Sequence, residues 1–204
     1  VLALGVFVLG VLGIMMLHLF GTMALFVKFL AGRSPRQFFR DIRPVLITAF
    51  STSSSSATMP TAIACARDTL KASPSVSGFV IPLGATMNMS GTALYEGCVV
   101  LFVAQVFGVD LSLAQQVTLL FLSVISAVAV AGIPGGSLPL IAGLLITFGI
   151  PPEGIGIILG ADRLLDMART AVNVGCDLVT VAVVERQTQK NNATDAAPPV
   201  EMAL

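Results

Sequence analysis

The stretch ADRLLDMARTAVNVGCD, from Ala161 to Asp177, lies between long apolar segments and carries three aspartates, two arginines and an asparagine. On a helix, at about 100° per residue, one narrow stripe with Thr170 at its border holds Asp162, Asp166, Arg169, Asn173 and Asp177. The intervening residues are mostly apolar and suit packing against lipid or protein. The stripe is therefore either the solvent-exposed face of a soluble amphipathic helix or a polar path inside a membrane protein.

Composition favours the membrane protein. Hydrophobic residues make up 55% of the 204 residues and charged residues only 11%, whereas a soluble domain needs more charge to cover its surface. Ionisable groups within a bilayer cost about 2.5–3.5 kcal/mol each on insertion scales, so they tend to mark a substrate or ion path. The formal net charge is zero, and no basic field therefore favours nucleic acid as a partner.

Enzyme and metal chemistry are poorly supported. The three cysteines are widely spaced and suggest neither a disulfide framework nor a metal cluster. The single histidine, His18, lies in an apolar run without a neighbouring ligand. An intramembrane serine hydrolase could be imagined from Ser51–Ser56, but it needs a base, and no His or Lys occurs in the later membrane segments. We therefore expect a protein that is not an enzyme and has no cofactor.

The chain begins at Val1 inside an apolar run, without Met and without the charged region of a signal peptide. We expect a truncated chain, and a non-functional fragment is one interpretation of it. Residues 1–31 are long enough to span a bilayer. Basic residues follow the end of this segment, which by the positive-inside rule is cytoplasmic.

Residues 36–68 predict a re-entrant hairpin. Two half-length apolar pieces flank Ser51–Ser56, and basic residues lie on both sides. Non-helical backbone at membrane depth is tolerated only where protein or a water-filled cavity covers it. The alternative is a Ser-rich linker between soluble helices.

Residues 76–108 predict a transmembrane helix that is broken at Asn88–Thr92. Such a break frees backbone carbonyls that can hold a cation, although Asn and Gly also suit close helix packing. Residues 113–150 predict a second re-entrant hairpin, with its tip at Gly132–Ser137. Residues 154–186 form the last predicted span, and the polar tail of residues 187–204 is expected to be disordered and cytoplasmic.

The same pattern occurs twice with opposite topology: a hairpin with a small-residue tip, then a span with a polar midpoint. This is typical of an inverted-repeat secondary transporter with its site near the membrane midplane. The predicted fold class is an all-α membrane protein with two re-entrant helical hairpins and broken transmembrane helices.

Four motifs resemble those of the dicarboxylate/amino-acid:cation symporters, which include prokaryotic aspartate and glutamate transporters and the excitatory amino-acid transporters of animals. In chain order they are SSSSATMP (Ser53–Pro60), GATMNMSGTALYEG (Gly84–Gly97), AGIPGG (Ala131–Gly136) and DRLLDMARTAVNVGCD (Asp162–Asp177). The resemblance covers residues 1–186 and implies a glutamate-transporter-like transport core. In that family the complete fold has eight spans and two hairpins, forms a homotrimer, and lies in the plasma membrane, which is the inner membrane in bacteria. The trimer-forming scaffold and the third span would lie outside this chain.

The resemblance also implies roles for substrate-binding residues. Asp166 would bind the substrate amino group and Arg169 the side-chain carboxylate, for which a guanidinium fork is well shaped. Asn173 and the backbone of the serine tip would take the α-carboxylate, helped by the dipole of the following half-helix. The predicted substrate-binding set is Ser53, Ser54, Ser55, Thr92, Ile133, Pro134, Gly135, Gly136, Ser137, Asp166, Arg169, Thr170 and Asn173, in which residues 133–137 form the outer gate.

Cation sites are implied in the same way. Hard oxygen ligands without Cys or His suit an alkali cation. One sodium site would use Gly84, Asn88, Asn173 and Asp177, and a further site would use Thr86 with carbonyls at Ala127, Val128 and Val130. Glu96 is the candidate proton carrier, because the proton-coupled animal carriers have Glu at this point.

The chain departs from the family pattern at several positions. Ser90 stands where the family usually has an Asp that helps to hold one sodium ion. Ser53 and Met167 occupy the two positions at which the family usually carries one extra Arg, and Ala127 and Val130 replace small polar residues near the second tip.

The predicted function is symport of glutamate or aspartate with sodium and/or protons, with membrane lipid as surroundings. A C4-dicarboxylate carrier is the alternative within the family, but a substrate without an amino group gains nothing from the intramembrane carboxylate of Asp166. A neutral amino-acid carrier is disfavoured because Arg169 would be left unpaired.

Overall fold

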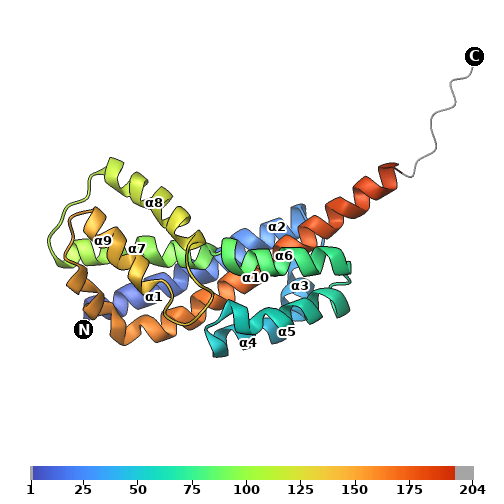
Figure 1. The fold of residues 1–204 in the computed structure, drawn as a ribbon, viewed down its shortest axis with the longest axis horizontal. Coiled ribbons are helices and arrows are strands. Elements are labelled where there is room, and N and C mark those ends of the chain that lie inside the picture. The colour runs from blue at the N-terminus through green and yellow to red at the C-terminus, as the bar shows by residue number, and fades with distance from the viewer. Residues whose placement is uncertain (1, 196–204) are drawn as a thin grey trace, which may run out of the picture.

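The computed structural model describes residues 2–195 and is helical along most of that range (Figure 1). The elements in chain order are α1 (Leu2–Leu17), the π-helix η1 (His18–Thr22), α2 (Met23–Phe29), α3 (Pro35–Asp41), α4 (Arg43–Thr52), α5 (Ser55–Asp68), α6 (Pro74–Met87), α7 (Ser90–Val106), α8 (Leu113–Val128), α9 (Leu138–Thr147), the 3-10 helix η2 (Pro152–Gly154) and α10 (Ile155–Asp195).

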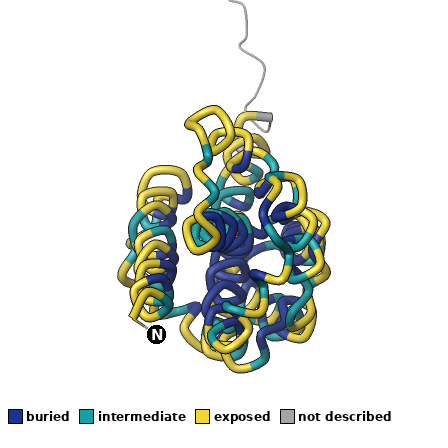
Figure 2. Tube along the Cα trace, turned by 90° about the vertical axis from the view of Figure 1, so that its left-hand side faces the viewer, coloured by how far each residue is buried: buried dark blue, intermediate teal, exposed yellow. Residues whose placement is uncertain are grey.

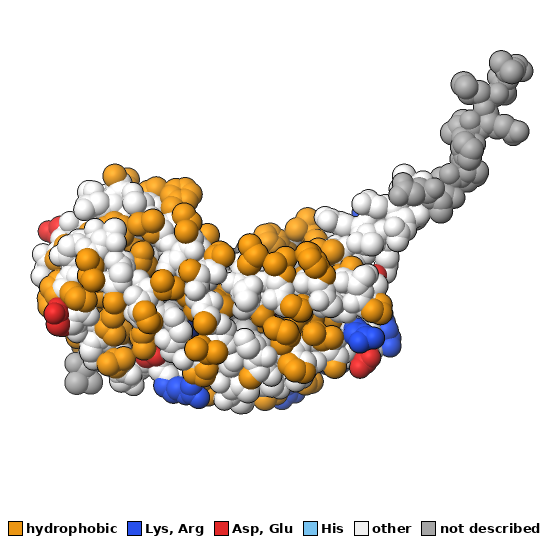
Figure 3. Space-filling model, in the orientation of Figure 1, with side chains coloured by type: hydrophobic (Ala, Val, Ile, Leu, Met, Phe, Trp, Pro, Cys, Tyr) orange, Lys and Arg blue, Asp and Glu red, His pale blue; other side chains and the backbone are white. Residues whose placement is uncertain are grey.

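Three helical stretches are long and apolar enough to cross a membrane: Leu2–Phe29, Pro74–Val106 and Pro152–Asn192. Helices α8 and α9 are apolar but shorter. The visible surface is covered mainly by apolar and uncharged side chains (Figure 3). The prediction of an all-helical protein with several membrane-type helices is therefore confirmed.

Helix α10 is the axis of the bundle. It packs against α1, α4, α5, α6 and α7. In the stretch Pro152–Asn192, 78% of the apolar 18-residue segment is buried, whereas the corresponding segment of Leu2–Phe29 is 22% buried. Figure 2 shows the buried positions gathered at the centre, while the N-terminal helix exposes most of its outer side. The polar stripe of α10 is thus enclosed by protein, and α1 presents an apolar face outward.

The far end of α10 is fixed to two helix termini. Arg186 Nη1 donates to the carbonyls of Phe29 (3.2 Å) and Leu30 (2.9 Å), which end α2. The Glu185 carboxylate accepts from the backbone N–H and the hydroxyl of Ser73, both at 2.9 Å, at the start of α6. Each charge has the sign that complements the helix terminus it contacts.

The helices break where small and polar residues interrupt the apolar runs. Ser53 ends α4 with a left-handed φ of 51°, and Ser54 caps α5 by accepting from the Ala57 N–H. Asn88 and Met89 have ψ values of 61° and 55°, so α6 does not continue into α7. The segment between α8 and α9 contains Gly135 at a φ of 72°, a conformation that glycine adopts without strain.

The end of α10 differs from the sequence-based expectation. A disordered tail is predicted from residue 187, whereas α10 stays helical to Asp195. The first strong helix breakers, Pro198 and Pro199, come later. The rest of the predicted tail, residues 196–204, lies outside the described residues.

Candidate functional site

A buried ion pair forms the centre of the site. Asp166 and Arg169 lie one turn apart on α10 and are each 3% exposed. Arg169 donates to Asp166 Oδ1 from Nη2 at 2.7 Å and from Nε at 3.0 Å. Removing either partner of such a pair leaves an uncompensated buried charge.

The segment between α8 and α9 covers this pair. The Gly135 backbone N–H donates to Asp166 Oδ2 at 2.9 Å, and Arg169 Nη1 donates to the hydroxyl of Ser137, which is fully buried. Ile133 and Pro134 of the same segment are exposed. The predicted gate segment therefore has a polar inner side on the ion pair and an outer side toward the surroundings.

Asn173 holds the broken span against α10. Its Oδ1 accepts from the Gly91 N–H at 2.8 Å, and its Nδ2 donates to Thr92 Oγ1 at 3.0 Å. A Cβ at Gly91 would lie 2.8 Å from the Arg169 carbonyl, so this close approach requires glycine. The Thr170 hydroxyl donates to the Asp166 carbonyl at 2.9 Å within the same helix.

The connection between α4 and α5 meets the connection between α8 and α9 beside the ion pair. The Ser54 hydroxyl donates to the Gly132 carbonyl at 2.7 Å, and the Ser56 N–H reaches the same oxygen at 3.3 Å. The Ser53 hydroxyl is buried and has no hydrogen-bond partner in the described part of the chain. A small cavity at this place is lined by residues that include Ser53, Ser55, Thr92, Ile133, Asp166 and Arg169.

This cavity has a volume of about 10 Å³, which is space for about one water molecule. It is lined by a carboxylate, a guanidinium, hydroxyls and an amide from four separate segments. Such a set can bind a small zwitterion that carries an additional negative charge, provided that the tips first move apart.

A second polar contact lies farther along α10. Asp177, which is 2% exposed, accepts from Asn88 Nδ2 at 3.0 Å. A Cβ at Gly84 would overlap the Asp177 carboxylate, so glycine permits this approach. The structure thus brings together Gly84, Asn88 and Asp177, whose oxygens are of the kind that alkali cations prefer. Asn173 directs its side chain toward Gly91 and Thr92 instead.

The residues of the further predicted cation site differ in their exposure. Ala127 and Val130 are buried together with Met89, and Val128 is exposed. Thr86 is also exposed, and its hydroxyl donates to the Leu83 carbonyl at 2.9 Å. The Thr86 hydroxyl is thus occupied within α6.

Glu96 lies in the interface between α7 and α8. It is fully buried, and neither carboxylate oxygen has a hydrogen-bond partner among residues 2–195. The Ser123 and Ser126 hydroxyls of α8 are likewise buried without partners in this range.

Tyr95 and a contact of His18 add to the residues predicted from the sequence. Tyr95 donates to Asp162 Oδ1 at 2.7 Å, and the Arg169 guanidinium lies 4.9 Å from the centre of its ring, an arrangement that favours the cation. The available signal was that the only tyrosine lies one turn beyond Gly91 and Thr92. His18, for which no partner was expected, lies with Nε2 3.2 Å from Ser90 Oγ.

Replacing Gly84 with alanine is expected to destabilise the protein, because the added methyl group would overlap the Asp177 carboxylate. Overpacking of this kind costs about 1–3 kcal/mol. Gly78 on the same helix has nothing within 4 Å of an added Cβ, so Gly78→Ala is the matched control. Thermal unfolding of both variants in detergent measures the difference. Equal midpoints for the two variants would contradict the packing described here.

The chain is similar in sequence to known membrane transporters. The family described as the Sodium:dicarboxylate symporter family matches residues 1–187. Excitatory amino acid transporter 4 of Rattus norvegicus is 38% identical over 92% of this chain and 33% of its own length. Excitatory amino acid transporter 3 of Mus musculus is 35% identical over 92% of this chain and 36% of its own length.

A Caenorhabditis elegans protein with the provisional name sodium-dependent excitatory amino acid transporter glt-4 is 39% identical over 90% of this chain and 36% of its own length. The chain spans about a third of the length of these curated relatives. Because the family match extends over nearly all of the described residues, the chain belongs to the Sodium:dicarboxylate symporter family.

Proposed function

We propose that this chain forms the substrate- and cation-binding part of a secondary transporter that carries acidic amino acids together with sodium and/or protons. The observation that carries the proposal is the buried Asp166–Arg169 pair, which contacts the Gly135 backbone N–H and the Ser137 hydroxyl. It offers one buried negative group and one buried positive group side by side. Relatives named as excitatory amino acid transporters support the same class of substrate.

In this proposal the substrate exchanges partners with the ion pair. The substrate amino group takes the place of Arg169 on the Asp166 carboxylate. Arg169 then binds the side-chain carboxylate of the substrate, with Thr92 and Thr170 at the edge of the site. Neither buried charge is left unpaired, which limits the cost of desolvation.

The α-carboxylate would lie between Asn173 and the start of α5. That helix has 14 residues and begins at Ser55, and the backbone N–H groups of a helix N-terminus favour an anion. Ser53 and Ser54 complete this side of the site. The Ser53 hydroxyl has no hydrogen-bond partner among residues 2–195 and is therefore an available donor.

Closure depends on the segment between α8 and α9. The cavity of about 10 Å³ is too small for an amino acid, because it holds about one water. The residues of the outer gate, Ile133, Pro134, Gly135, Gly136 and Ser137, must therefore move away from α10 for entry. The Ser54–Gly132 hydrogen bond breaks in that step.

Cation binding is proposed at two places. The first uses the side chains of Asp177 and Asn88 with the Gly84 carbonyl and Asn173. The second uses Thr86 with the carbonyls of Ala127, Val128 and Val130, after Thr86 turns away from Leu83. Oxygen ligands of this type suit sodium rather than a transition metal.

The proposed membrane arrangement follows the sequence pattern. Residues 36–68 and 113–150 enter and leave the bilayer on the same side as two re-entrant hairpins related by an inverted repeat. Residues 1–31, 76–108 and 154–186 span it. The C-terminus is cytoplasmic, and the protein that carries this chain assembles as a trimer in the plasma membrane.

Substrate-induced thermal stabilisation tests the proposed function. The protein that carries this chain is purified in detergent and heated with aspartate, glutamate or succinate, in sodium or in potassium. A ligand at 100 times its Kd stabilises by about 2.7 kcal/mol. We expect stabilisation by aspartate or glutamate in sodium and not by succinate. A shift with succinate alone would instead indicate the C4-dicarboxylate carrier.

Replacing Glu96 with glutamine is expected to remove the dependence of net uptake on external pH. Exchange of internal for external substrate should survive, because it does not require release of the proton. The buried hydroxyls of Ser123 and Ser126 lie on α8. Uptake into proteoliposomes at several external pH values measures the effect.

The exposed Glu153 provides the matched control. Glu153→Gln should keep the pH profile of the unmodified protein. Should Glu96→Gln keep it as well, Glu96 is structural and the coupling ion is sodium alone.

A further inference from the structure

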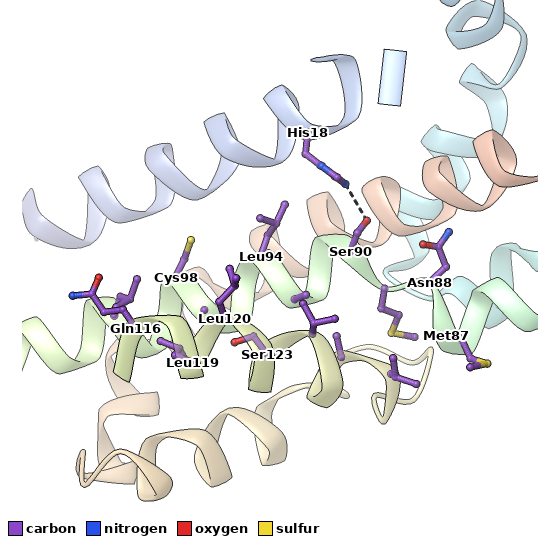
Figure 4. Close-up of a pocket in the computed structure, with 17 residues that line it drawn as sticks. His18, Met87, Asn88, Ser90, Leu94, Cys98, Gln116, Leu119, Leu120 and Ser123 are labelled. Carbon is purple, nitrogen blue, oxygen red and sulfur yellow. Dashed lines mark hydrogen bonds between the residues drawn. The ribbon is translucent and has the colours of Figure 1, made fainter. Parts of the chain in front are cut away.

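Three donor atoms from distant parts of the chain meet beside the break between α6 and α7. His18 Nε2 lies 3.2 Å from Ser90 Oγ and 3.8 Å from Cys176 Sγ. Ser90 Oγ lies 3.2 Å from Cys176 Sγ. Figure 4 shows His18 directed from the N-terminal helix toward Ser90 at the start of α7. The contacts proposed for the substrate and for sodium do not use any of these three atoms.

The local backbone directs His18 to this place. His18 begins the π-helix η1 that separates α1 from α2, and π-helical turns occur frequently at functional sites. The turn presents an imidazole on the inner side of an otherwise apolar span. Cys176 faces it from α10 and is 2% exposed.

A cavity gives access to the cluster. Its volume is about 470 Å³, and its wall is mainly apolar. His18 and Ser90 lie on this wall together with Asn88, Gln116 and Ser123 (Figure 4). An ion with part of its hydration shell therefore has a route to His18 and Ser90 and space for a water ligand. Cys176 does not line the cavity, but its Sγ lies directly behind these two atoms, within 3.8 Å of both.

We propose that His18, Ser90 and Cys176 form a binding site for a borderline or soft divalent cation of the zinc and cadmium class. Zinc–ligand bonds are about 2.0–2.1 Å to nitrogen or oxygen and about 2.3 Å to sulfur. Combined with the three separations of 3.2, 3.2 and 3.8 Å, these lengths give angles at the metal of roughly 90–120°. The ion would lie above the plane of the three atoms, with its fourth position open toward the cavity.

The donor set decides the class of ion. Imidazole and thiolate select zinc and softer metals, whereas sodium prefers oxygen. The described residues contain no cluster of three His, Cys, Asp or Glu side chains. In the proposed site the third protein ligand is the Ser90 hydroxyl, which lies 3.2 Å from each of the other two atoms. Since a hydroxyl is a weaker ligand than a second thiolate, we expect a regulatory site rather than a structural one.

The site is adjacent in sequence to the proposed sodium contact. Cys176 precedes Asp177, and Ser90 follows Asn88 by two residues. A bound ion would tie η1, α7 and α10 together and restrict the Asn88–Asp177 contact. Inhibition of uptake is therefore expected, and this consequence rests on the proposed function, whereas metal binding itself does not.

Cadmium binding tests the site directly. In the protein that carries this chain, Cys65, Cys98 and every other cysteine except Cys176 are replaced by alanine. Cadmium chloride is then titrated, and the ultraviolet charge-transfer band of the thiolate–cadmium bond is recorded. We expect one cadmium ion per chain with this band. Binding that shows no such band would overturn the proposal.

Two variants in this background identify the ligands. Cys176→Ser should abolish the band. His18→Gln should weaken cadmium binding at least tenfold, while its amide preserves a hydrogen bond to Ser90 and its unfolding temperature shows that the fold is intact. A band that persists in Cys176→Ser, or an unchanged affinity in a folded His18→Gln, would show that cadmium binds elsewhere.

Discussion

Replacing Arg169 with cysteine is expected to abolish most uptake of aspartate and glutamate while uptake of serine or alanine persists or emerges. Truncating one partner of a buried, hydrogen-bonded charge pair costs about 2–5 kcal/mol, and about 1.4 kcal/mol corresponds to a tenfold change in affinity. Affinity for acidic substrates should therefore fall roughly 30-fold or more. A neutral amino acid needs no cation for its side chain, and its amino group can still neutralise Asp166.

Competition experiments in proteoliposomes measure this switch, with labelled serine and labelled aspartate as separate substrates. Arg163 is exposed on the same helix, so Arg163→Cys is the matched control and should retain acidic selectivity. Persistence of serine uptake shows that the Arg169 variant is folded. Unchanged aspartate affinity in Arg169→Cys would contradict the proposed role of the ion pair.

Replacing Asp177 with asparagine is expected to act through the cation. The change removes a full negative charge from an enclosed oxygen site but keeps a side chain that can still contact Asn88. Sodium affinity should fall at least tenfold. Because coupling between two ligands is reciprocal, aspartate affinity should fall with it at a fixed sodium concentration, and high sodium should restore it.

The matched control is Asp110→Asn, since Asp110 is exposed and lies between α7 and α8. The measurement is the sodium dependence of aspartate binding in detergent. If Asp177→Asn shows the sodium dependence of the unmodified protein, then this contact is structural and the cation lies elsewhere.

The buried polar stripe could be predicted from sequence because its residues lie on a single helix. The polar residues between Asp162 and Asp177 recur at helical spacing within an apolar chain. Periodicity and composition therefore suffice to place them on one inward face. The breaks at Ser53 and at Asn88–Met89 could be predicted for a similar local reason. Small and polar residues there interrupt runs that are otherwise apolar.

Contacts between distant segments could not be predicted in this way. Tyr95 and Asp162 are 67 positions apart, and His18 and Cys176 are 158 apart. No sequence period relates such pairs, and only the packing of η1 and α7 on α10 brings them together. The mutual pairing of Asp166 and Arg169 is a different case. Their spacing of three residues permits contact on a helix, but sequence does not say whether they bind each other or a ligand.

Uptake of labelled aspartate into proteoliposomes, with the sodium gradient and the pH gradient imposed separately, tests the central claim most directly. The protein that carries this chain should accumulate aspartate inside the vesicles only when a cation gradient is directed inward. Glutamate should compete for this uptake, and succinate should not. Accumulation that is independent of both gradients, or transport of succinate without transport of aspartate, would contradict the assignment as a cation-coupled carrier of acidic amino acids.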